Sequence, residues 1–209
     1  VIDAIKSSGL DWLFIIGWSQ IALSLLLKAP SKGVLGAHPT LLPIGRGRAA
    51  IPWAILKDLK ETGVTLFKLD HGVDTGPIAI QKIIEIKSGC TAEDLYQEVD
   101  IKHVEIIKEA IPLLLKDNLL FKDQNDDDAT IWSGRSPKDG EIDLQGSVYE
   151  AERLVRAITH PYPGAFIHKD GKKIVIWKAV VTDNSFKGQT LDFSDGVLGL
   201  IYFNESPEN

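Results

Sequence analysis

The sequence predicts an α/β fold, in which a mostly parallel sheet with helices is followed by a small β-rich domain. In residues 1–121, short apolar runs that suit buried strands alternate with segments of helical spacing, and this alternation is typical of α/β layers. The composition turns polar and acidic at residue 122, and short strand patterns then follow one another. We therefore expect a first domain over residues 1–121, and a linker with a small second domain over residues 122–209.

The elements of the first domain are predicted from hydrophobic spacing and from residues that begin or end a helix. Pro30 ends the helix that follows the first strand. Thr91, with Asp94 three residues later, begins the longest helix as an approximate capping box. Strands are expected at residues 13–17, 33–38, 63–70 and 78–86, and helices at 19–28, 49–60 and 91–116.

The second domain is predicted to hold one helix and several short strands. Asp170-Gly171 joins two strand patterns and is a common hairpin turn. The acidic stretch at residues 123–128 is interpreted as a solvated loop, because it lacks the glycine and glutamate spacing of a calcium-binding EF-hand. A divalent-cation site is the alternative for this stretch. The helix is expected at residues 147–159, and the strands at 165–168, 173–181 and 191–202.

The composition is that of a globular protein without disulfide chemistry. The 209 residues are 44% hydrophobic and 25% charged, the net charge is −6, and Cys90 is the one cysteine. We interpret Cys90 as structural or incidental rather than catalytic, and we expect a reducing, cytoplasmic location. The acidic balance disfavours a nucleic-acid partner, and no apolar run suits a membrane span. Because the chain begins with Val1 and stops just after a strand pattern, it is interpreted as a fragment or a trimmed chain.

His38 and Asp74 are the candidate catalytic residues. His38 closes the strand expected at 33–38, and Asp74 lies in the loop after the strand expected at 63–70. Ligands in open α/β sheets bind beyond the carboxyl ends of the strands, so both loops are expected to face one crevice. A histidine there can take a proton from an attacking amine, and a carboxylate can stabilise the imidazolium. A histidine that is merely hydrogen-bonded in its loop is the alternative.

The motifs around these two residues resemble those of the formyltransferases that use 10-formyltetrahydrofolate. The family's first loop reads Asn-x-His-Pro-Ser-Leu-Leu-Pro, followed by Arg-Gly, and its second loop reads Gly-x-Asp-Thr-Gly. The matching residues are Gly36-Ala37-His38-Pro39-Thr40-Leu41-Leu42-Pro43, then Arg46-Gly47, and Gly72-Val73-Asp74-Thr75-Gly76. The resemblance covers residues 10–117 and implies a Rossmann-like catalytic domain whose amino-terminal part is missing from this sequence.

Two stretches of the second domain, residues 135–143 and 153–166, are similar to the sugar N-formyltransferases. The resemblance implies that 10-formyltetrahydrofolate donates a formyl group to the amine of a UDP- or dTDP-linked deoxyamino sugar. It further implies a role in O-antigen or lipopolysaccharide biosynthesis, without a metal ion, and leaves a homodimer open. One alternative is a methionyl-tRNA formyltransferase, which the acidic charge disfavours. The other is a catalytically impaired folate- or nucleotide-binding relative.

The resemblance also assigns roles to individual positions. The catalytic residues are expected to be His38, as the base, and Asp74, as its support. The pterin end of the cofactor is expected to contact Trp18, Ser19, Gln20, Ile21, Asp70, His71, Gly72 and Val73. Diphosphate or sugar contacts are expected from Arg135, Arg156 and Tyr162, since arginine binds phosphate in a bidentate manner. Core packing is the alternative for Trp18, and a structural pairing with Asp139 or Glu141 is the alternative for the arginines.

One position departs from the family pattern. Gly36 stands where the family has an asparagine that donates to the formyl oxygen. Loss of one such donor lowers the rate by about 10²–10³-fold. The candidate replacements are Gln20, Ser19 and Thr40, in that order, and protonated His38. Nearby, at least one of Arg46 and Arg48 is expected to have a structural role rather than to bind substrate phosphate.

Overall fold

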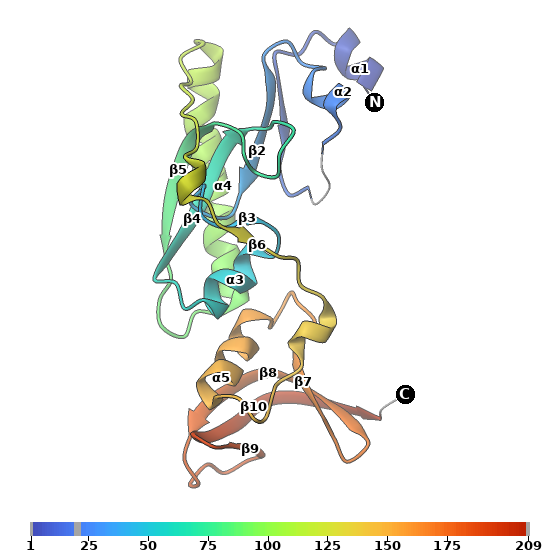
Figure 1. Cartoon of the computed structure of the whole chain (residues 1–209), viewed down its shortest axis with the longest axis vertical. Helices are drawn as coiled ribbons and strands as arrows, with labels where there is room; N and C mark the ends of the chain where they lie inside the picture. Colours follow the sequence, from blue (N-terminus) through green and yellow to red (C-terminus); the bar gives the residue numbers. More distant parts are fainter. Residues whose placement is uncertain (1, 19–21, 208–209) are drawn as a thin grey trace. The chain divides into compact units, whose positions relative to one another are not determined.

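The computed structural model describes residues 2–18 and 22–207, which form two compact units (Figure 1). The second unit takes in two segments from the first half of the chain, and the linear division at residue 121 stays a prediction. No helix among the described residues is long and apolar enough to cross a membrane. The first unit comprises Val1–Ala50, Glu61–Glu85 and Glu98–Ser133, and the second comprises Ile51–Lys60, Ile86–Gln97 and Gly134–Asn209.

A four-stranded sheet forms the centre of the first unit, in the order β1-β2-β4-β5 (Figure 1). β2 pairs in parallel with β1 and antiparallel with β4, and β5 is antiparallel to β4. The α/β class is confirmed, whereas parallel pairing is limited to β1 and β2 among the described strands of this sheet. The strands are β1 at Trp12–Ile15, β2 at Gly33–His38, β4 at Glu61–Lys68 and β5 at Ile78–Glu85.

The short connection between β4 and β5 explains why these two strands pair antiparallel. A parallel pair needs a crossover of about a dozen residues or more, usually a helix. The loop at 69–77 is shorter and contains no helix, so β5 returns antiparallel to β4. In the antiparallel register of β2 and β4, His38 lies opposite Thr65, while Lys68 lies opposite Leu35. β2 and β4 therefore end at opposite edges of the sheet, and the loop after β4 must double back to reach His38.

α4 forms as the sequence predicts, because its first turn is capped reciprocally. It spans Ala92–Leu115. The backbone N–H of Thr91 donates to Oδ2 of Asp94 at 2.9 Å, and the backbone N–H of Asp94 donates to Oγ1 of Thr91 at 3.2 Å. Further along the helix, an ion pair of 2.5 Å joins Glu109 to Lys82 on β5. Local capping thus sets where α4 begins, and the ion pair links it to the sheet.

The shorter helices are less well predicted. The helix expected at 49–60 is α3, Ala50–Leu56, and it ends early because Asp58 adopts a left-handed φ of 50°. Of the helix expected at 19–28, residues 19–21 lie outside the described residues. The described remainder is helical only at α2, Ser24–Leu27, whose start has no side-chain cap. One further helix, α1, spans Ile2–Ser7.

The second unit contains an antiparallel sheet in the order β7-β8-β10-β9, with α5 packed against β8 and β10 (Figure 1). Asp170 and Gly171 form the predicted hairpin turn, with left-handed φ values of 52° and 68°. The strand pattern at 191–202 is two strands, because the chain turns at residues 194–195. The predicted β-rich domain is confirmed. Its elements are α5 at Val148–Ala157, β7 at Ala165–Lys169, β8 at Lys172–Thr182, β9 at Thr190–Phe193 and β10 at Gly196–Pro207.

A short parallel ladder in the first unit joins the loop after β2 to the chain that follows α4. It pairs β3, Arg46–Gly47, with β6, Ile131–Trp132. Gly47 has a left-handed φ of 108°, and a Cβ there would lie 2.4 Å from the carbonyl oxygen of Trp132. Only glycine fits this close approach, which brings residues 124–132 beside the His38 loop. Two 3₁₀ turns flank β6, at Asp126–Asp128 and Pro137–Gly140.

Candidate active site

His38 ends β2, and its side chain is anchored on the loop that follows. The residue is 8% exposed, and its Nε2 lies 2.8 Å from the carbonyl oxygen of Gly45. A carbonyl oxygen can only accept a hydrogen bond, so Nε2 carries the hydrogen. Nδ1 is therefore the unprotonated nitrogen of the neutral ring, and it is the atom that can take up a proton.

Asp74 faces that nitrogen with its carboxylate. Its Oδ2 lies 3.6 Å from Nδ1 of His38, beyond a hydrogen bond but close enough for attraction to a protonated ring. The same Oδ2 accepts the backbone N–H of Gly47 at 2.9 Å. Asp74 has a left-handed φ of 55°, which is uncommon outside glycine, so surrounding contacts must hold this conformation. The two side chains are 10% and 19% exposed, and the pair is therefore largely shielded from water.

Close backbone packing and a side-chain hydrogen bond shape the loop at residues 70–76. A Cβ on Gly76 would lie 1.8 Å from the carbonyl oxygen of Lys68, so this position requires glycine. Oδ1 of Asp70 accepts the hydroxyl of Thr75 at 2.7 Å. At least part of the family's second motif thus serves the shape of the loop rather than the chemistry.

The residues expected to hold the pterin fall on two segments. Four of them follow β4 and are exposed: Asp70, His71, Gly72 and Val73. Trp18 is 63% exposed, which favours contact with a ligand over core packing, the alternative for this side chain. The other three, Ser19, Gln20 and Ile21, lie outside the described residues. The pterin-binding role of both segments stays a prediction.

Leu69 fills the space beside Gly36, where the family asparagine would project. A Cβ on Gly36 would lie 2.6 Å from Cδ2 of Leu69. The backbone N–H of Leu69 donates to the carbonyl oxygen of Val34 at 2.8 Å, which holds this residue against β2. Thr40, one of the expected replacements for the asparagine, has a buried hydroxyl without a hydrogen-bond partner among the described residues. Because that hydroxyl is buried, it is not placed to donate to a bound formyl group.

Arg46 has the structural role that was expected of one arginine in this loop. It is 5% exposed, and its Nε and Nη2 donate to Oε1 of Gln124 at 3.0 and 2.9 Å. Nη2 also donates to Oδ1 of Asp126 at 2.8 Å, while Arg48 is exposed. The acidic stretch at 123–128 is largely exposed, as expected of a solvated loop, and only Gln124 and Asp126 contact Arg46. Among the described residues, no three His, Cys, Asp or Glu side chains are arranged so that they could hold a metal ion.

Sequence reasoning missed the residues that support His38 and Asp74. Gln124 donates to the carbonyl oxygen of Asp74 at 2.8 Å, yet it lies in a polar stretch with the composition of any loop. The sequence offers one signal, the arginine of the Arg46-Gly47 motif, because an arginine that becomes buried requires several acceptors. The acidic stretch is a nearby source of acceptors in the sequence, but spacing alone does not pair the two segments.

Arg156 and Tyr162, which are expected to contact substrate, have partners within the second unit. Nε of Arg156 donates to Glu152 at 2.7 Å, and its Nη1 donates to the carbonyl oxygen of Cys90 at 2.8 Å. The hydroxyls of Tyr162 and Tyr96 lie 2.9 Å apart, and burial together with this contact raises the pKa of Tyr162. These contacts favour a structural role for Arg156 and Tyr162, whose substrate contacts stay predictions.

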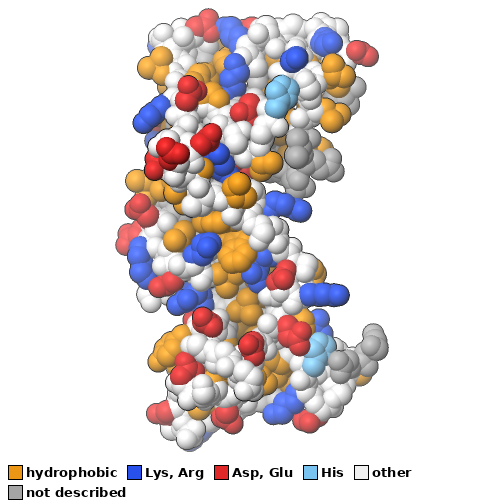
Figure 2. All heavy atoms as spheres, in the orientation of Figure 1, with side chains coloured by type: hydrophobic (Ala, Val, Ile, Leu, Met, Phe, Trp, Pro, Cys, Tyr) orange, Lys and Arg blue, Asp and Glu red, His pale blue; other side chains and the backbone are white. Residues whose placement is uncertain are grey.

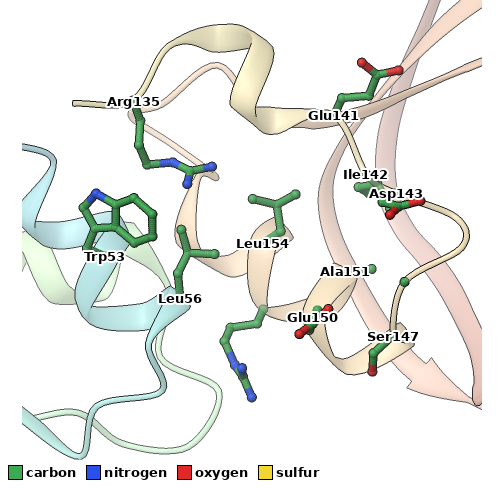
Figure 3. Close-up of a pocket in the computed structure, with 12 residues that line it drawn as sticks. Trp53, Leu56, Arg135, Glu141, Ile142, Asp143, Ser147, Glu150, Ala151 and Leu154 are labelled. Carbon is green, nitrogen blue, oxygen red and sulfur yellow. The ribbon is translucent and has the colours of Figure 1, made fainter. Parts of the chain in front are cut away.

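Arg135 lines a pocket of the second unit (Figure 3). Its guanidinium lies 5.1 Å from the centroid of the Trp53 ring, and burial lowers the pKa of this group. Nη2 donates to the backbone carbonyl oxygen of Asp139 at 2.6 Å. The structural alternative for Arg135, a pairing with Asp139, is therefore made through the backbone of Asp139 and not through its carboxylate. The pocket has a volume of about 320 Å³, within the range of small-molecule sites. Glu141 and Asp143 lie across it from Trp53 (Figure 3), which gives the pocket both signs of charge.

Comparison with known proteins identifies the family. Residues 1–111, more than half of the 209 residues, match the family described as Formyl transferase. The chain belongs to the formyl transferase family. Residues 135–203 match the carboxyl-terminal domain of formyl transferases. The resemblance drawn from the two motifs, and from the two stretches of the second domain, is therefore confirmed.

Relatives of this chain include a curated protein, of whose length the chain spans less than a third, and several solved structures. The bifunctional polymyxin resistance protein ArnA of Wigglesworthia glossinidia brevipalpis is 34% identical over 195 residues, which cover 92% of this chain but 30% of that protein. A methionyl-tRNA formyltransferase from Clostridium thermocellum has a TM-score of 0.70 at 23% identity, over 87% of this chain and 77% of that one. An N-formyltransferase from Helicobacter canadensis, in complex with folinic acid and dTDP-3-aminofucose, has a TM-score of 0.70 at 21% identity, over 90% and 73%. These structural likenesses confirm the formyl transferase fold.

Proposed function

We propose that this chain carries a site that transfers a formyl group from 10-formyltetrahydrofolate to the amine of a nucleotide-linked deoxyamino sugar. The observation that carries the proposal is the arrangement of His38 and Asp74. Nε2 of the imidazole is anchored on the Gly45 carbonyl, while Nδ1 faces the Asp74 carboxylate at 3.6 Å. One ring nitrogen is thus left to take a proton, beside a negative charge that stabilises the imidazolium.

The transfer forms a bond between the amine nitrogen and the formyl carbon, breaks the bond between that carbon and N10 of the folate, and requires one proton acceptor. The lone pair of the acceptor amine forms a bond to the formyl carbon, and the carbonyl electrons move onto oxygen. Nδ1 of His38 accepts the proton that leaves the amine nitrogen. The carbonyl then re-forms as the bond from the formyl carbon to N10 of the folate breaks, and N10 takes the proton from His38. The products are the N-formyl sugar and tetrahydrofolate, and the base is restored.

The pterin end of the folate is proposed to bind at the exposed residues after β4 and at Trp18. Support comes from the exposure of the Trp18 ring, at 63%, and of Val73, at 48%, because aromatic and apolar surface suits a flat ring. The relative from Helicobacter canadensis was solved with folinic acid, a folate. Binding of tetrahydrofolate should therefore quench the fluorescence of Trp18, and Trp18→Ala should remove that part of the signal.

Three observations favour an amino sugar over tRNA as the acceptor. The Helicobacter canadensis relative was solved with dTDP-3-aminofucose. The net charge is −6, and positive and negative side chains are interspersed on the face shown in Figure 2, whereas tRNA binding calls for concentrated positive charge. Arg135 also offers a partly buried guanidinium to a phosphate. A place in O-antigen or lipopolysaccharide biosynthesis stays a prediction from the resemblance.

The proposal is tested by assaying formyl transfer with 10-formyltetrahydrofolate and a panel of dTDP- and UDP-linked amino sugars. We expect N-formyl product with at least one sugar, and its loss in His38→Ala. Turnover that survives in His38→Ala, or no product with any amino sugar, would overturn the proposal. A parallel gel shift with initiator tRNA at low salt separates the tRNA alternative, for which we expect no shifted band.

One specific observation favours a second candidate function, a folate-binding protein with impaired catalysis. Leu69 fills the space beside Gly36, so the family's donor to the formyl oxygen is replaced by an apolar side chain. Loss of such a donor typically costs about 10²–10³-fold in rate. Calorimetry distinguishes the two candidates: tight folate binding without turnover supports the impaired protein.

A further inference from the structure

Gln124 joins the loop that carries Asp74 to a buried arginine. Its Nε2 donates to the carbonyl oxygens of Asp74 and Gly76, at 2.8 and 2.7 Å. Its Oε1 accepts Nε and Nη2 of Arg46, at 3.0 and 2.9 Å. Only this orientation of the amide satisfies every contact, because arginine is purely a donor and a carbonyl purely an acceptor. The side chain is therefore held at both ends.

The arginine end of this connection is firmly anchored. Arg46 is 5% exposed, and it also contacts Asp126 at 2.8 Å. Its backbone N–H donates to the carbonyl oxygen of Thr130 at 2.9 Å, within the ladder of β3 and β6. Arg46 is thus constrained through both side chain and backbone, and Gln124 transmits that constraint to the Asp74 loop.

The same segment also supports His38. Oγ1 of Thr130 accepts the backbone N–H of Gly45 at 2.8 Å, and the carbonyl oxygen of Gly45 contacts Nε2 of His38 at 2.8 Å. Residues 124–130 therefore contact the supports of both members of the catalytic pair. Contacts on either side of the pair fix the distance between its imidazole and its carboxylate.

We propose that Gln124 is a positioning residue for formyl transfer, and this inference rests on the proposed function. By holding the backbone of residues 74 and 76, Gln124 keeps Asp74 in its left-handed conformation, with Oδ2 directed at Nδ1 of His38 and at the Gly47 amide. Without the two donated hydrogen bonds, the loop relaxes and the carboxylate moves away from the imidazole. A displacement of about 1 Å in a catalytic site can cost about 100-fold in rate.

The test compares two single variants, each of which replaces one glutamine by glutamate. Gln124→Glu keeps an acceptor for Arg46 and removes both donors to the loop, and Gln124→Met is a second variant without charge. Gln81→Glu is the control, because Gln81 also donates from Nε2 to two acceptors in this unit, Leu42 O at 2.9 Å and Thr65 Oγ1 at 2.8 Å. Neither of these hydrogen bonds reaches the Asp74 loop.

The first readout does not depend on activity. The amide of Gly47 donates to Oδ2 of Asp74, so its hydrogen exchange, followed by NMR, reports whether the carboxylate is in place. We expect faster exchange at Gly47 in both Gln124 variants and in Asp74→Ala, but not in Gln81→Glu, with the amides of β4 as internal reference. Unchanged protection of Gly47 in a folded Gln124 variant overturns the proposal, whether or not the protein shows turnover.

The second readout is a double-mutant cycle. We expect kcat to fall by roughly 10- to 100-fold in Gln124→Glu, with a smaller change in the KM for 10-formyltetrahydrofolate. In an Asp74→Asn background the same change should have almost no further effect, since Gln124 acts through Asp74. Fully additive losses overturn the proposal. If Gly47 exchange accelerates but the unmutated protein transfers no formyl group, the proposed function fails and the positioning contact stands.

Discussion

At the scale of single residues, the tautomer of the neutral His38 ring follows from one contact. The Gly45 carbonyl accepts from Nε2, so the neutral ring presents Nδ1 as its basic atom, on the side of Asp74. The family motif names the histidine, but it does not say which nitrogen reacts. That choice decides the direction from which the acceptor amine must approach.

Removing either member of this pair should lower kcat to a different extent. His38→Ala removes the proton acceptor and should lower kcat by about 10²–10⁴-fold, the usual contribution of a general base. Asp74→Asn keeps an oxygen for the Gly47 amide but removes the charge, so its loss should be smaller. Steady-state kinetics measures both, with circular dichroism as the control for folding. A larger loss in Asp74→Asn than in His38→Ala would contradict the assignment of His38 as the base.

Gly36 and Leu69 should behave as a coupled pair. Gly36→Asn alone places a Cβ 2.6 Å from Cδ2 of Leu69, and such overpacking should destabilise the protein by about 1–3 kcal/mol. Leu69→Ala makes room, so the double variant should recover stability relative to Gly36→Asn and turn over faster than Leu69→Ala. Urea unfolding and the formyl transfer assay provide the two measurements. Independent, additive effects of the two substitutions would show that Leu69 does not fill the space of the asparagine.

At the scale of elements, helix ends and turns are largely local. α4 begins where Thr91 and Asp94 predict, because each side chain accepts the other's backbone N–H. The turn at Asp170-Gly171 forms because both residues adopt a left-handed φ. By contrast, α3 ends four residues before the expected position of 60, at Leu56. Its left-handed Asp58 gives no clear signal in the hydrophobic spacing, so the end of this helix was missed.

The cap of α4 should contribute measurable stability. Thr91→Ala should lower the free energy of unfolding by about 1 kcal/mol, the typical value of a lost N-cap. Chemical denaturation at neutral pH provides the measurement. Thr91→Ser is the matched control, because serine keeps the accepting hydroxyl and should retain most of the stability. Equal losses in the two variants would mean that the hydroxyl does not act as the cap.

The same cap should also be sensitive to acid. Hydrogen bonds from the Thr91 side chain and backbone hold the pKa of Asp94 below its ordinary value of 3.8. A carboxyl group with a lowered pKa stabilises the folded state above its unfolded pKa, and this contribution is lost as the pH falls through the folded pKa. The stability difference between the original protein and Asp94→Asn should therefore shrink as the pH falls below about 4. A difference that is constant from pH 7 to pH 3 would argue against a charged cap.

At the scale of the whole molecule, several carboxylates share this behaviour. Backbone and side-chain hydrogen bonds lower the pKa of Asp139 and of Asp195, and Asp195 accepts from Ser147 and Val148 at the start of α5. Since each shift is downward, their stabilising effect is present at neutral pH and is lost on acidification. We expect the midpoint of thermal unfolding to fall steadily below about pH 4, as calorimetry would show. Asp195→Asn should flatten part of this decline.

The sequence by itself determined the α/β class, the bounds of β2, the start of α4, the hairpin at Asp170-Gly171 and the family. These features depend on residues that are adjacent or a few positions apart, whose spacing, caps and turn geometry are encoded locally. The pairing direction of β2 and β4, the filling of the Gly36 space by Leu69 and the hold of Gln124 on the Asp74 loop were decided only by the tertiary structure. Gln124 and Asp74 are separated by 50 positions, and the polar composition around Gln124 suits a solvated loop equally well. Contacts between such distant segments arise only when the whole chain packs, and these contacts set the position of Asp74 relative to His38.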